Sequence, residues 1–214
     1  MPVRKVSNRG GNIIGRFPSL KLQRMVQFES TIERDYLYLL DYEADITHFE
    51  EQPLAIEYRH EGKLQHYTPD FHVVQSAKNV LAECKPALLV DAEDNPIKFM
   101  VADLYCGERG WTFRVVTDAE IRSGWRLANV KTLRRYACLN IRPELEGRIY
   151  ALLYDSLTQW TVAQIHASIG GDPAATSAAV FRMAYHHKLE IPLDDSPITA
   201  NSPVCLNNHK GGRP

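Results

Sequence analysis

The chain has few cysteines, and their spacing excludes two common kinds of small cysteine-dependent site. Its 214 residues include only four, at 84, 106, 138 and 205, and no two of them form a C-x-x-C pair. Neither a disulfide framework nor a zinc knuckle is therefore expected. The eight histidines are scattered as well. His66 and His72 flank Asp70, but Pro69 interrupts the strand between them, which argues against a metal held by histidine.

Long hydrophobic stretches are also missing. The sequence has no apolar run of 18 residues and no secretory signal, while 44% of its residues are hydrophobic and 24% are charged. This composition is ordinary for a globular protein, with enough residues for one large domain or two small ones. We therefore expect no membrane segment and a cytoplasmic protein, associated with the nucleoid when it binds DNA.

Acidic residues are absent from residues 1–28, although the net charge of the chain is only −1. Residues 29–70 are strongly acidic, and a basic stretch follows from 122 to 148. Basic segments around an acidic centre fit a nuclease that grips phosphates at its rim and concentrates cations in its middle. From the basic stretch we select Lys131, Arg134 and Arg135 as DNA-binding candidates. A disordered tail and a solvated helix face are the alternatives.

Two short segments carry the strongest chemical signal, YTPDF at 67–71 and LAECK at 81–85. Glu83 and Lys85 project from the same face of a strand because side chains alternate. A hairpin strand that starts at Pro69 brings Asp70 beside them. Two carboxylates and an ammonium at a strand pair can hold a divalent metal next to a phosphodiester. The alternative is a turn aspartate with a Glu–Lys pair.

An amphipathic helix is predicted upstream, because apolar residues recur at 28, 32, 36, 39 and 40. Glu33 lies beside this apolar stripe and can face the edge of the sheet. Ser30 and Glu33 also match a capping box, in which Glu33 would only bind the backbone N–H of Ser30. Glu29 is then the alternative ligand. For Gln52, which precedes Pro53, we favour a role at the end of a strand over a hydrogen bond near the site.

The order of these elements is that of the PD-(D/E)XK nuclease core. The segments SxxERDYLYLL, FEEQP, YTPDF and ECKP resemble the TnsA endonuclease subunit of heteromeric bacterial cut-and-paste transposases. The resemblance is strong over residues 17–125 and looser towards the C-terminus. Cys84 stands where the family usually has an aliphatic residue, but only its backbone carbonyl is expected to touch metal.

The resemblance implies a restriction-endonuclease-like α/β fold with a mixed sheet flanked by helices. Two carboxylates about 4 Å apart repel by roughly 4 kcal/mol, so a hard divalent cation is needed where they converge. We assign Mg²⁺, with Mn²⁺ able to substitute, to Asp70, Glu83 and the Cys84 carbonyl. Glu33 would complete the site directly, through water or at a second ion. Lys85 would position or activate the attacking water; a surface charge at a strand end is the alternative.

The remaining pattern predicts further elements and a second module. A helix over 96–109, a strand over 111–116, a short helix capped by Asp118 and a helix over 129–139 follow. The strand–helix–strand order predicts a parallel crossover. Between 144 and 191, Thr161 and Asp172 cap helices of a winged-helix-like module suited to docking or backbone contact rather than base readout. We expect a basic arm (1–28), an endonuclease domain (29–139), this module (140–195) and a flexible tail (196–214).

The resemblance also implies the biological role. The protein would cleave the 5′ ends of a transposon in double-stranded DNA, beside a DDE-family transposase subunit that cuts the 3′ ends. An AAA+ regulator would dock on the C-terminal region. Two alternatives remain open: a standalone restriction or repair endonuclease with the same core, and a catalytically silent DNA- or protein-binding adaptor on a decayed nuclease fold.

Overall fold

The computed structural model describes residues 13–92, 95–154 and 159–207, which fall into two compact units, Met1–Ser123 and Gly124–Pro214. The sequence predicts that the endonuclease domain ends at residue 139, whereas the helix that begins at Arg126 packs within the second unit. No helix of the described residues combines the length and the apolar character needed to cross a membrane.

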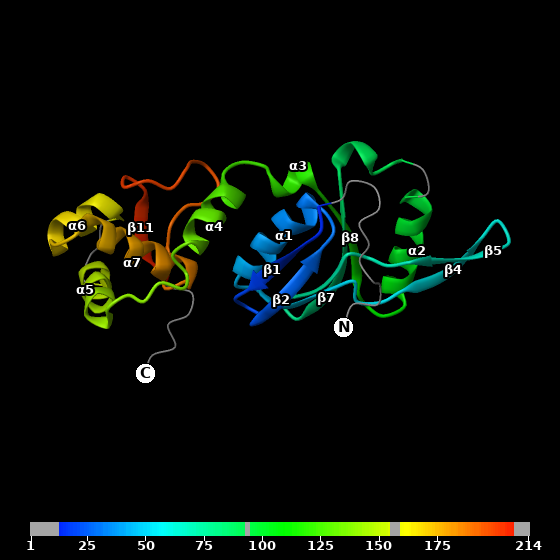
Figure 1. Cartoon of the computed structure of the whole chain (residues 1–214), viewed down its shortest axis with the longest axis horizontal. Helices are drawn as coiled ribbons and strands as arrows, with labels where there is room; N and C mark the ends of the chain where they lie inside the picture. Colours follow the sequence, from blue (N-terminus) through cyan, green and yellow to red (C-terminus); the bar gives the residue numbers. More distant parts are fainter. Residues whose placement is uncertain (1–12, 93–94, 155–158, 208–214) are drawn as a thin grey trace. The chain divides into compact units, whose positions relative to one another are not determined.

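A four-stranded mixed sheet forms the centre of the first unit (Figure 1). Its strands, in spatial order, are β3 (Ile46–Glu51), β6 (Phe71–Gln75), β7 (Lys78–Lys85) and β8 (Thr112–Thr117). The pairs β3–β6 and β6–β7 are antiparallel, while β7 and β8 are parallel, with Lys85 opposite Thr117. The mixed sheet expected from the crossover is therefore confirmed.

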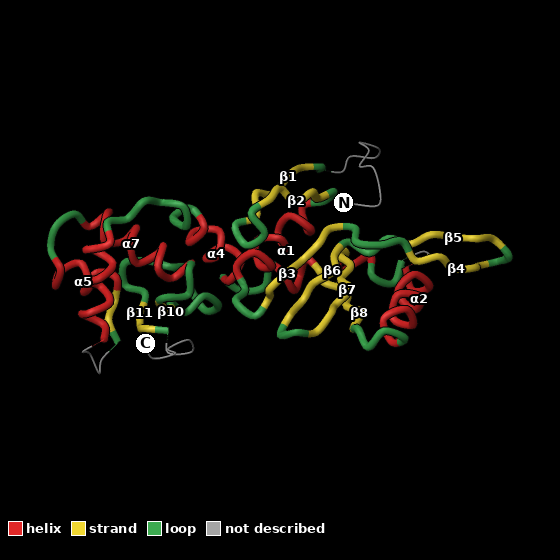
Figure 2. The backbone as a smooth tube through the Cα atoms, turned by 90° about the horizontal axis from the view of Figure 1, so that it is seen from below, coloured by secondary structure: helices red, strands yellow, loops and turns green. Residues whose placement is uncertain are grey.

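Helices cover this sheet on both faces, as Figure 2 shows for α1 (Thr31–Tyr42) and α2 (Asn95–Gly107). On the α2 face, Leu81 of β7 packs with Tyr67, Ala102 and Cys106 in an apolar cluster. On the α1 face, the ring of Phe71 meets that of Tyr36. Side chains alternate along β7, so Glu83 shares the face of Leu81.

Residues 15–28 of the expected basic arm form a β-hairpin, β1 (Gly15–Ser19) with β2 (Arg24–Phe28). Phe17 and Val26 are buried, and the ammonium of Lys21 donates to the carbonyls of Leu40 and Glu43, both at 2.6 Å. The hairpin thus closes the C-terminal end of α1, where carbonyls lack helical partners. Residues 1–12 of that arm lie outside the described residues.

A second hairpin, β4 (Ile56–His60) with β5 (Lys63–Tyr67), projects from the sheet (Figure 1). The helix predicted near 96–109 is present as α2, and the strand after it as β8. One cap differs from expectation: Thr117, not Asp118, caps α3 (Asp118–Ile121) by accepting from the N–H of Glu120. The Asp118 carboxylate instead accepts at 2.8 Å from the N–H of Ala87, the first residue of the short 3₁₀ helix η1 (Ala87–Leu89).

Four helices and a small sheet make up the described part of the second unit. The helices are α4 (Arg126–Arg134), α5 (Pro143–Tyr154), α6 (Val162–Ile169) and α7 (Pro173–Tyr185). The sheet has the order β10 (Leu189–Glu190), β11 (Pro203–Leu206) and β9 (Trp160–Thr161). Thr161 and Asp172 cap α6 and α7 as predicted, whereas α4 begins and ends earlier than the predicted 129–139.

The expected flexible tail differs from the structure over residues 196–207. Strand β11 lies between β9 and β10, and its Val204 is fully buried. The buried amide of Asn129 donates to the carbonyl of Ser196 at 2.7 Å and accepts from the N–H of Ile198 at 2.9 Å. These hydrogen bonds join residues that are far apart in the sequence, so the local composition of the tail could not reveal them. The rest of the predicted tail, residues 208–214, lies outside the described residues.

Candidate active site

The predicted site residues on the strands meet where β6 begins and β7 ends. Asp70 immediately precedes β6, while Glu83, Cys84 and Lys85 are the last residues of β7. The Asp70 carboxylate accepts a hydrogen bond from the backbone N–H of Cys84 at 2.7 Å. The antiparallel pairing of β6 with β7 therefore places Asp70 beside Glu83 and Lys85, as the spacing of the two segments predicted.

Both oxygens of the Glu83 carboxylate have a partner. Oε1 is 2.7 Å from the ammonium nitrogen of Lys85. Oε2 accepts a hydrogen bond of 2.8 Å from the hydroxyl of Tyr67, the last residue of β5. Glu83 is only 4% exposed, so these two contacts replace most of the water that an isolated carboxylate would need.

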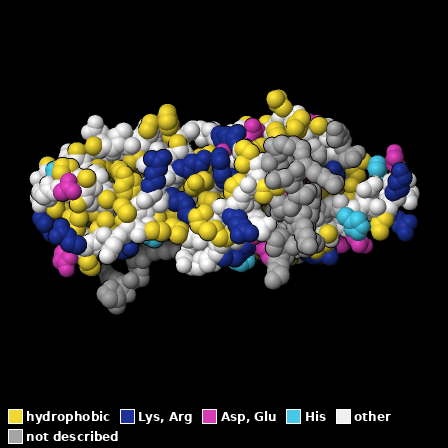
Figure 3. Space-filling model, in the orientation of Figure 1, with side chains coloured by type: hydrophobic (Ala, Val, Ile, Leu, Met, Phe, Trp, Pro, Cys, Tyr) yellow, Lys and Arg dark blue, Asp and Glu magenta, His cyan; other side chains and the backbone are white. Residues whose placement is uncertain are grey.

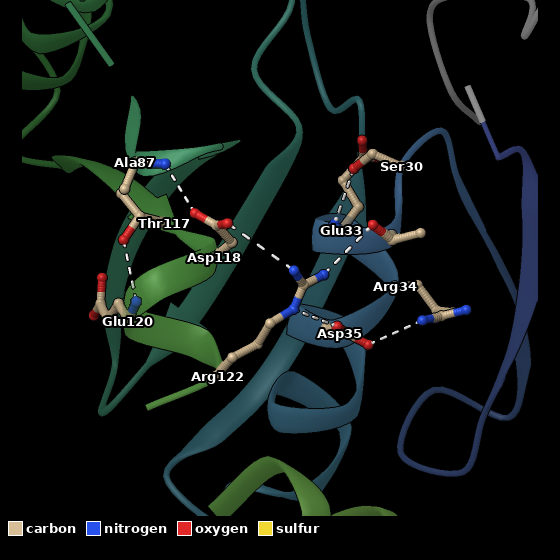
Figure 4. Close-up of polar contacts among 10 residues, drawn as sticks. Ser30, Glu33, Arg34, Asp35, Ala87, Thr117, Asp118, Glu120 and Arg122 are labelled. Atoms are coloured by element: carbon tan, nitrogen blue, oxygen red, sulfur yellow. Dashed lines mark hydrogen bonds and ion pairs between the residues drawn. The ribbon is translucent and has the colours of Figure 1, made fainter. Parts of the chain in front are cut away.

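Glu33 lies in the first turn of α1, and its contacts differ from a regular capping box (Figure 4). Its backbone N–H donates to the hydroxyl of Ser30 at 3.1 Å, as a cap requires. Its carboxylate, however, accepts from the N–H of Glu29 at 2.8 Å, one residue before the expected Ser30. Glu33 thus stabilises the start of the helix while its buried carboxylate adds charge to the site.

Burial and neighbouring carboxylates disfavour the charged forms of Asp70 and Glu33. Burial, followed by the charges of Glu83 and Glu33, raises the pKa of Asp70 well above its usual value. Burial also raises the pKa of Glu33, with added repulsion from Glu29 and Glu83. For Lys85, burial acts to lower the pKa, but the neighbouring Glu83, Asp70 and Glu33 prevail and raise it. The site therefore concentrates negative charge that one ammonium does not balance.

The Cys84 side chain belongs to the core and not to this charged group. It is 6% exposed, and burial together with the surrounding carboxylates raises its thiol pKa well above the usual value. The thiol therefore stays protonated and is a poor metal ligand. Any contribution of Cys84 to metal binding has to come from its backbone carbonyl.

Gln52 connects the strand end to the site. It has the left-handed φ of 45°, which is unusual for a residue other than glycine. Its backbone N–H donates to the carbonyl of Asp70 at 2.8 Å, and its side-chain amide donates to the Glu29 carboxylate at 2.8 Å. Its amide oxygen is buried with no hydrogen-bond partner among the described residues. Gln52 thus both ends β3 and fixes the backbone of Asp70.

Arg122 links α1 to α3 near Glu33 (Figure 4). Its Nε donates to Asp35 at 2.9 Å, its Nη2 donates to the Thr31 hydroxyl at 3.4 Å, and its Nη1 lies 4.0 Å from Asp118. The charge pattern places this arginine in the basic stretch that we expect to grip phosphates. The structure shows it fastening the first turn of α1, which carries Glu33, to the helix that follows β8.

The donor set fits a hard divalent cation such as Mg²⁺. All candidate donors are oxygens. Burial and then repulsion between carboxylates raise the pKa of Asp70 and of Glu33, and a bound cation relieves that repulsion. Over residues 13–92, 95–154 and 159–207, however, no three His, Cys, Asp or Glu side chains are arranged as a ready metal cage. Glu33 is turned towards the Glu29 N–H. In proteins generally, Mg²⁺ is bound by one or two carboxylates together with waters and a substrate phosphate.

The predicted DNA-binding residues lie on and just after α4 in the second unit, over which Figure 3 shows Lys and Arg side chains. Arg134 donates to the hydroxyl of the buried Tyr185 at 3.0 Å, so part of its guanidinium is committed to packing against α7. Lys131 is half-buried, and Arg135 is exposed. The histidines that flank Asp70 in sequence have other neighbours: His66 lies 3.6 Å from Glu57, and His72 bonds Asn79 at 2.9 Å.

The segment that carries the strand part of this site matches a known protein family. Residues 43–118 match the family model for the TnsA-like endonuclease N terminal domain. The chain contains a TnsA-like endonuclease domain. The match includes Asp70, Glu83 and Lys85, while Glu33 on α1 precedes it. A comparison with curated proteins finds no match. The TnsA-like domain relates the chain to nuclease subunits of transposases.

Sequence reasoning missed Tyr67 and undervalued Gln52. Tyr67 stood in the YTPDF segment, and a buried tyrosine usually has a partner for its hydroxyl. That general tendency was the only local signal, and it did not name Glu83. Gln52 was correctly expected at a strand end, but its bonds to Asp70 and Glu29 depend on β3 and β6 being neighbours.

Proposed function

We propose that this protein is the metal-dependent DNA endonuclease subunit of a heteromeric transposase and cleaves the 5′ ends of the transposon. The observation that carries the proposal is the meeting of Asp70, Glu83 and Lys85 at the β6–β7 pair within a TnsA-like endonuclease domain. The charge of Glu33, felt at Asp70, adds the helix carboxylate of a PD-(D/E)XK site. It would act in the cytoplasm, on DNA of the nucleoid.

In this proposal, Asp70, Glu83 and the Cys84 carbonyl hold Mg²⁺ or Mn²⁺. The ion supplies a more acidic bound water and offsets the charge that develops on the phosphate. Glu33, which already points its carboxylate at the Glu29 N–H, would act through water or at a second ion. This division follows the contacts: Asp70 and Glu83 lie on neighbouring strand ends, whereas Glu33 comes from a helix.

We assign Lys85 a contact with the attacking water or the phosphate and not with the ion, because an ammonium has no lone pair to give a metal. Three acidic neighbours keep it charged, and its side chain is 30% exposed, so it can reach substrate. It would orient the attacking water and stabilise the negative charge of the transition state.

For the second unit we propose a winged-helix-like module that docks on partners. Helix α6, the turn at Gly170 and Gly171, and α7 have helix-turn-helix order, with β10 and β11 as the wing. Most of α7 is buried, and its most exposed helical residues are Pro173 and Ala174, which lack the side chains that read bases. Docking of a DDE-family transposase subunit and an AAA+ regulator is therefore favoured over base readout.

Apolar side chains support docking. Four large hydrophobic residues of the second unit are 43–69% exposed: Trp125, Leu139, Tyr150 and Tyr154. Figure 3 shows hydrophobic side chains spread over the helices of this unit on the face that it draws. Exposed apolar surface of this kind commonly marks protein contacts. Arg135, which is exposed, and Lys131 would add contacts to the DNA backbone.

A metal-dependent nicking assay tests the function. We expect the wild-type chain, together with a co-encoded DDE transposase, to nick DNA at the 5′ transposon end in Mg²⁺. Asp70→Ala should abolish nicking, because it removes a carboxylate of the proposed metal site. Asp103→Ala, on the exposed face of α2, is the matched control and should cut normally.

The outcomes separate the alternatives. Nicking by the chain alone, on DNA without transposon ends, would favour a standalone restriction or repair nuclease. DNA or partner binding without nicking under any metal would favour a silent adaptor. If Asp70→Ala nicks as well as wild type in the transposase complex, the endonuclease assignment fails.

A further inference from the structure

The arrangement around Glu83 raises a question about how a metal could reach it. Lys85 occupies Oε1 at 2.7 Å, and the Tyr67 hydroxyl occupies Oε2 at 2.8 Å. The carboxylate is nearly inaccessible, with 4% of its residue surface exposed. Any cation that binds Glu83 at close range therefore has to share or replace one of these two partners.

The two partners differ in charge and in mobility. Lys85 carries a positive charge on a long side chain that is 30% exposed, so the ammonium can leave the carboxylate for water or a phosphate. The Tyr67 hydroxyl is neutral, and its ring is 5% exposed within the apolar cluster of Ile56, Leu81, Ala102 and Cys106. A divalent cation repels the ammonium but is compatible with a hydroxyl that donates to the other oxygen.

We propose that Glu83 exchanges Lys85 for the metal ion at Oε1 while Tyr67 stays on Oε2, which makes Tyr67 a positioning residue. The inference rests on the proposed nuclease function and extends it to a residue not assigned above. Tyr67 holds the carboxylate in one orientation before and after the exchange. Lys85, once released, is free to face the phosphate, so its catalytic position is reached only when the ion is in place.

The position of Tyr67 in the chain supports this role. It ends β5, and Asp70 follows three residues later, immediately before β6. The hydroxyl of Tyr67 is bonded to Glu83 and the carboxylate of Asp70 to the Cys84 N–H, so one short segment is bonded to β7 at two successive residues. A shift of this segment would move both proposed metal-binding carboxylates together.

Titration calorimetry with Mg²⁺ and with Mn²⁺, on the full chain without DNA, tests the exchange. Tyr67→Phe keeps the ring and removes only the hydroxyl, and we expect metal affinity about 10–100-fold weaker, as for loss of a partner that orients a ligand. Lys85→Met removes the competitor for Oε1, and we expect affinity about tenfold tighter. Tyr58→Phe, on the partner strand and packed on the same cluster, is the matched control and should bind as wild type.

A second readout follows Lys85 itself. In ¹H–¹⁵N spectra of lysine ammonium groups, assigned with Lys85→Arg, we expect the Lys85 signal to shift and its proton exchange with water to accelerate when Mg²⁺ is added. In Tyr67→Phe the same shift should need a correspondingly higher Mg²⁺ concentration. Circular dichroism without metal should show a folded protein for every variant.

Several results would overturn the exchange. Wild-type or tighter metal affinity in Tyr67→Phe would mean that the hydroxyl competes with the ion rather than positioning its ligand. A Lys85 signal that ignores saturating Mg²⁺, or a wild-type chain that binds no metal, would equally refute it. The nuclease assignment is judged separately by the Asp70→Ala nicking assay, so cleavage with an unchanged Lys85 signal would refute only the exchange.

Discussion

The two units place their acidic side chains in opposite environments. In the first, burial and neighbouring carboxylates raise the pKa of Asp70 and of Glu33. In the second, Glu146 accepts from Lys188 at 2.9 Å and pairs with Arg182. Burial acts to raise the pKa of Glu146, but these two cations prevail and lower it. The first unit holds carboxylates close together, whereas the second unit pairs the carboxylate of Glu146 with cations.

Most of the described non-glycine positions with positive φ lie in hairpin turns, but one is at the charged site. Among the described residues, five non-glycine positions of the first unit have positive φ, and one of the second does. Those of the first unit are Gln23, Gln52, Glu61, Ser76 and Ala77, and that of the second is His187. Of these, Gln52 bonds directly to Asp70, the residue with the strongly raised pKa. Strain and repulsion at the same place cost stability, and such costs are typical of functional sites.

This contrast locates the chemistry. A protein selected only for stability would pair Asp70 and Glu33 with cations, as the second unit pairs Glu146. The unbalanced charge at the β6–β7 pair is instead what an incoming cation would stabilise. In the second unit, Glu146 and Asp194 are paired with cations, an arrangement that serves folding rather than metal binding.

A large effect on catalysis is expected from the loss of Lys85. Lys85→Ala should cut the single-turnover cleavage rate by on the order of 10²–10⁴-fold, because it removes the group that orients water or stabilises the transition state. Metal affinity should be unchanged or improved, since a cation has left the site. Truncation after Ser123, where the first unit ends, should do the reverse, losing partner docking with the metal site intact. Wild-type cleavage by Lys85→Ala, or loss of metal, would contradict its assigned role.

Glu33→Gln tests whether the helix carboxylate belongs to the charged group or only to the cap. Glutamine can still accept from the Glu29 N–H, so the free energy of unfolding should change by at most about 1 kcal/mol. Cleavage should nevertheless be lost, because the charge is gone. Single-turnover nicking and thermal melting measure the two quantities. Full activity would transfer the role to Glu29 or remove a helix ligand, and Glu29→Gln is the companion variant.

Glu146→Gln tests the second half of the comparison. The change leaves Arg182 and Lys188 without their carboxylate, and we expect the free energy of unfolding to fall by about 1–2 kcal/mol, less than for a fully buried pair because Lys188 is half exposed. Mg²⁺ affinity should not change. Chemical denaturation with and without Mg²⁺ measures both, and a change in metal affinity would mean that the division between units is wrong.

The pH dependence of stability should have opposite signs at the two places. The folded-state pKa of Asp70 is raised, so the metal-free protein loses stability as pH rises from the usual carboxyl range through the raised value. The folded-state pKa of Glu146 is lowered, so its contribution is present above the usual value and is lost as pH falls. Asp70→Asn should therefore stabilise the apo protein more at pH 8 than at pH 5. Glu146→Gln should destabilise it more at pH 8 than near pH 4.

Melting curves in EDTA across this range provide the measurement, with Asp103→Asn as the control for an exposed aspartate. Excess Mg²⁺ should remove the stabilising effect of Asp70→Asn, because the bound ion offsets the repulsion in wild type. Equal pH slopes for wild type and Asp70→Asn would show that Asp70 does not carry the repulsive charge.

Local sequence predicted much of the secondary structure and the strand part of the site. The caps at Ser30, Thr161 and Asp172 depend on residues two or three positions apart, and all three begin helices as expected. Glu83 and Lys85 share a face because strand side chains alternate. The β6–β7 hairpin has only a short turn, so Asp70 could also be placed beside them from spacing alone.

Contacts between distant segments were not predictable in this way. The hairpin formed by β1 and β2 looked like a basic arm, because the bonds of Lys21 to the end of α1 are invisible in composition. The tail rich in Pro, Asn and Gly looked mobile, although Asn129 and the neighbouring strands hold it. Polar composition reports a segment's own tendency to fold and says nothing of a partner far away in sequence.

The sequence by itself determined the acidic centre, the order of the nuclease elements and the identity of Asp70, Glu83 and Lys85 as site candidates. Only the tertiary structure decided which groups hold the site residues: the Tyr67 hydroxyl on the Glu83 carboxylate, the Gln52 N–H on the backbone carbonyl of Asp70, and the Glu29 N–H on the Glu33 carboxylate. The physical reason is the distance along the sequence over which each interaction acts. Strand alternation and helix capping act over a few residues, whereas a buried carboxylate takes its hydrogen bonds from whichever segments the folded chain brings against it.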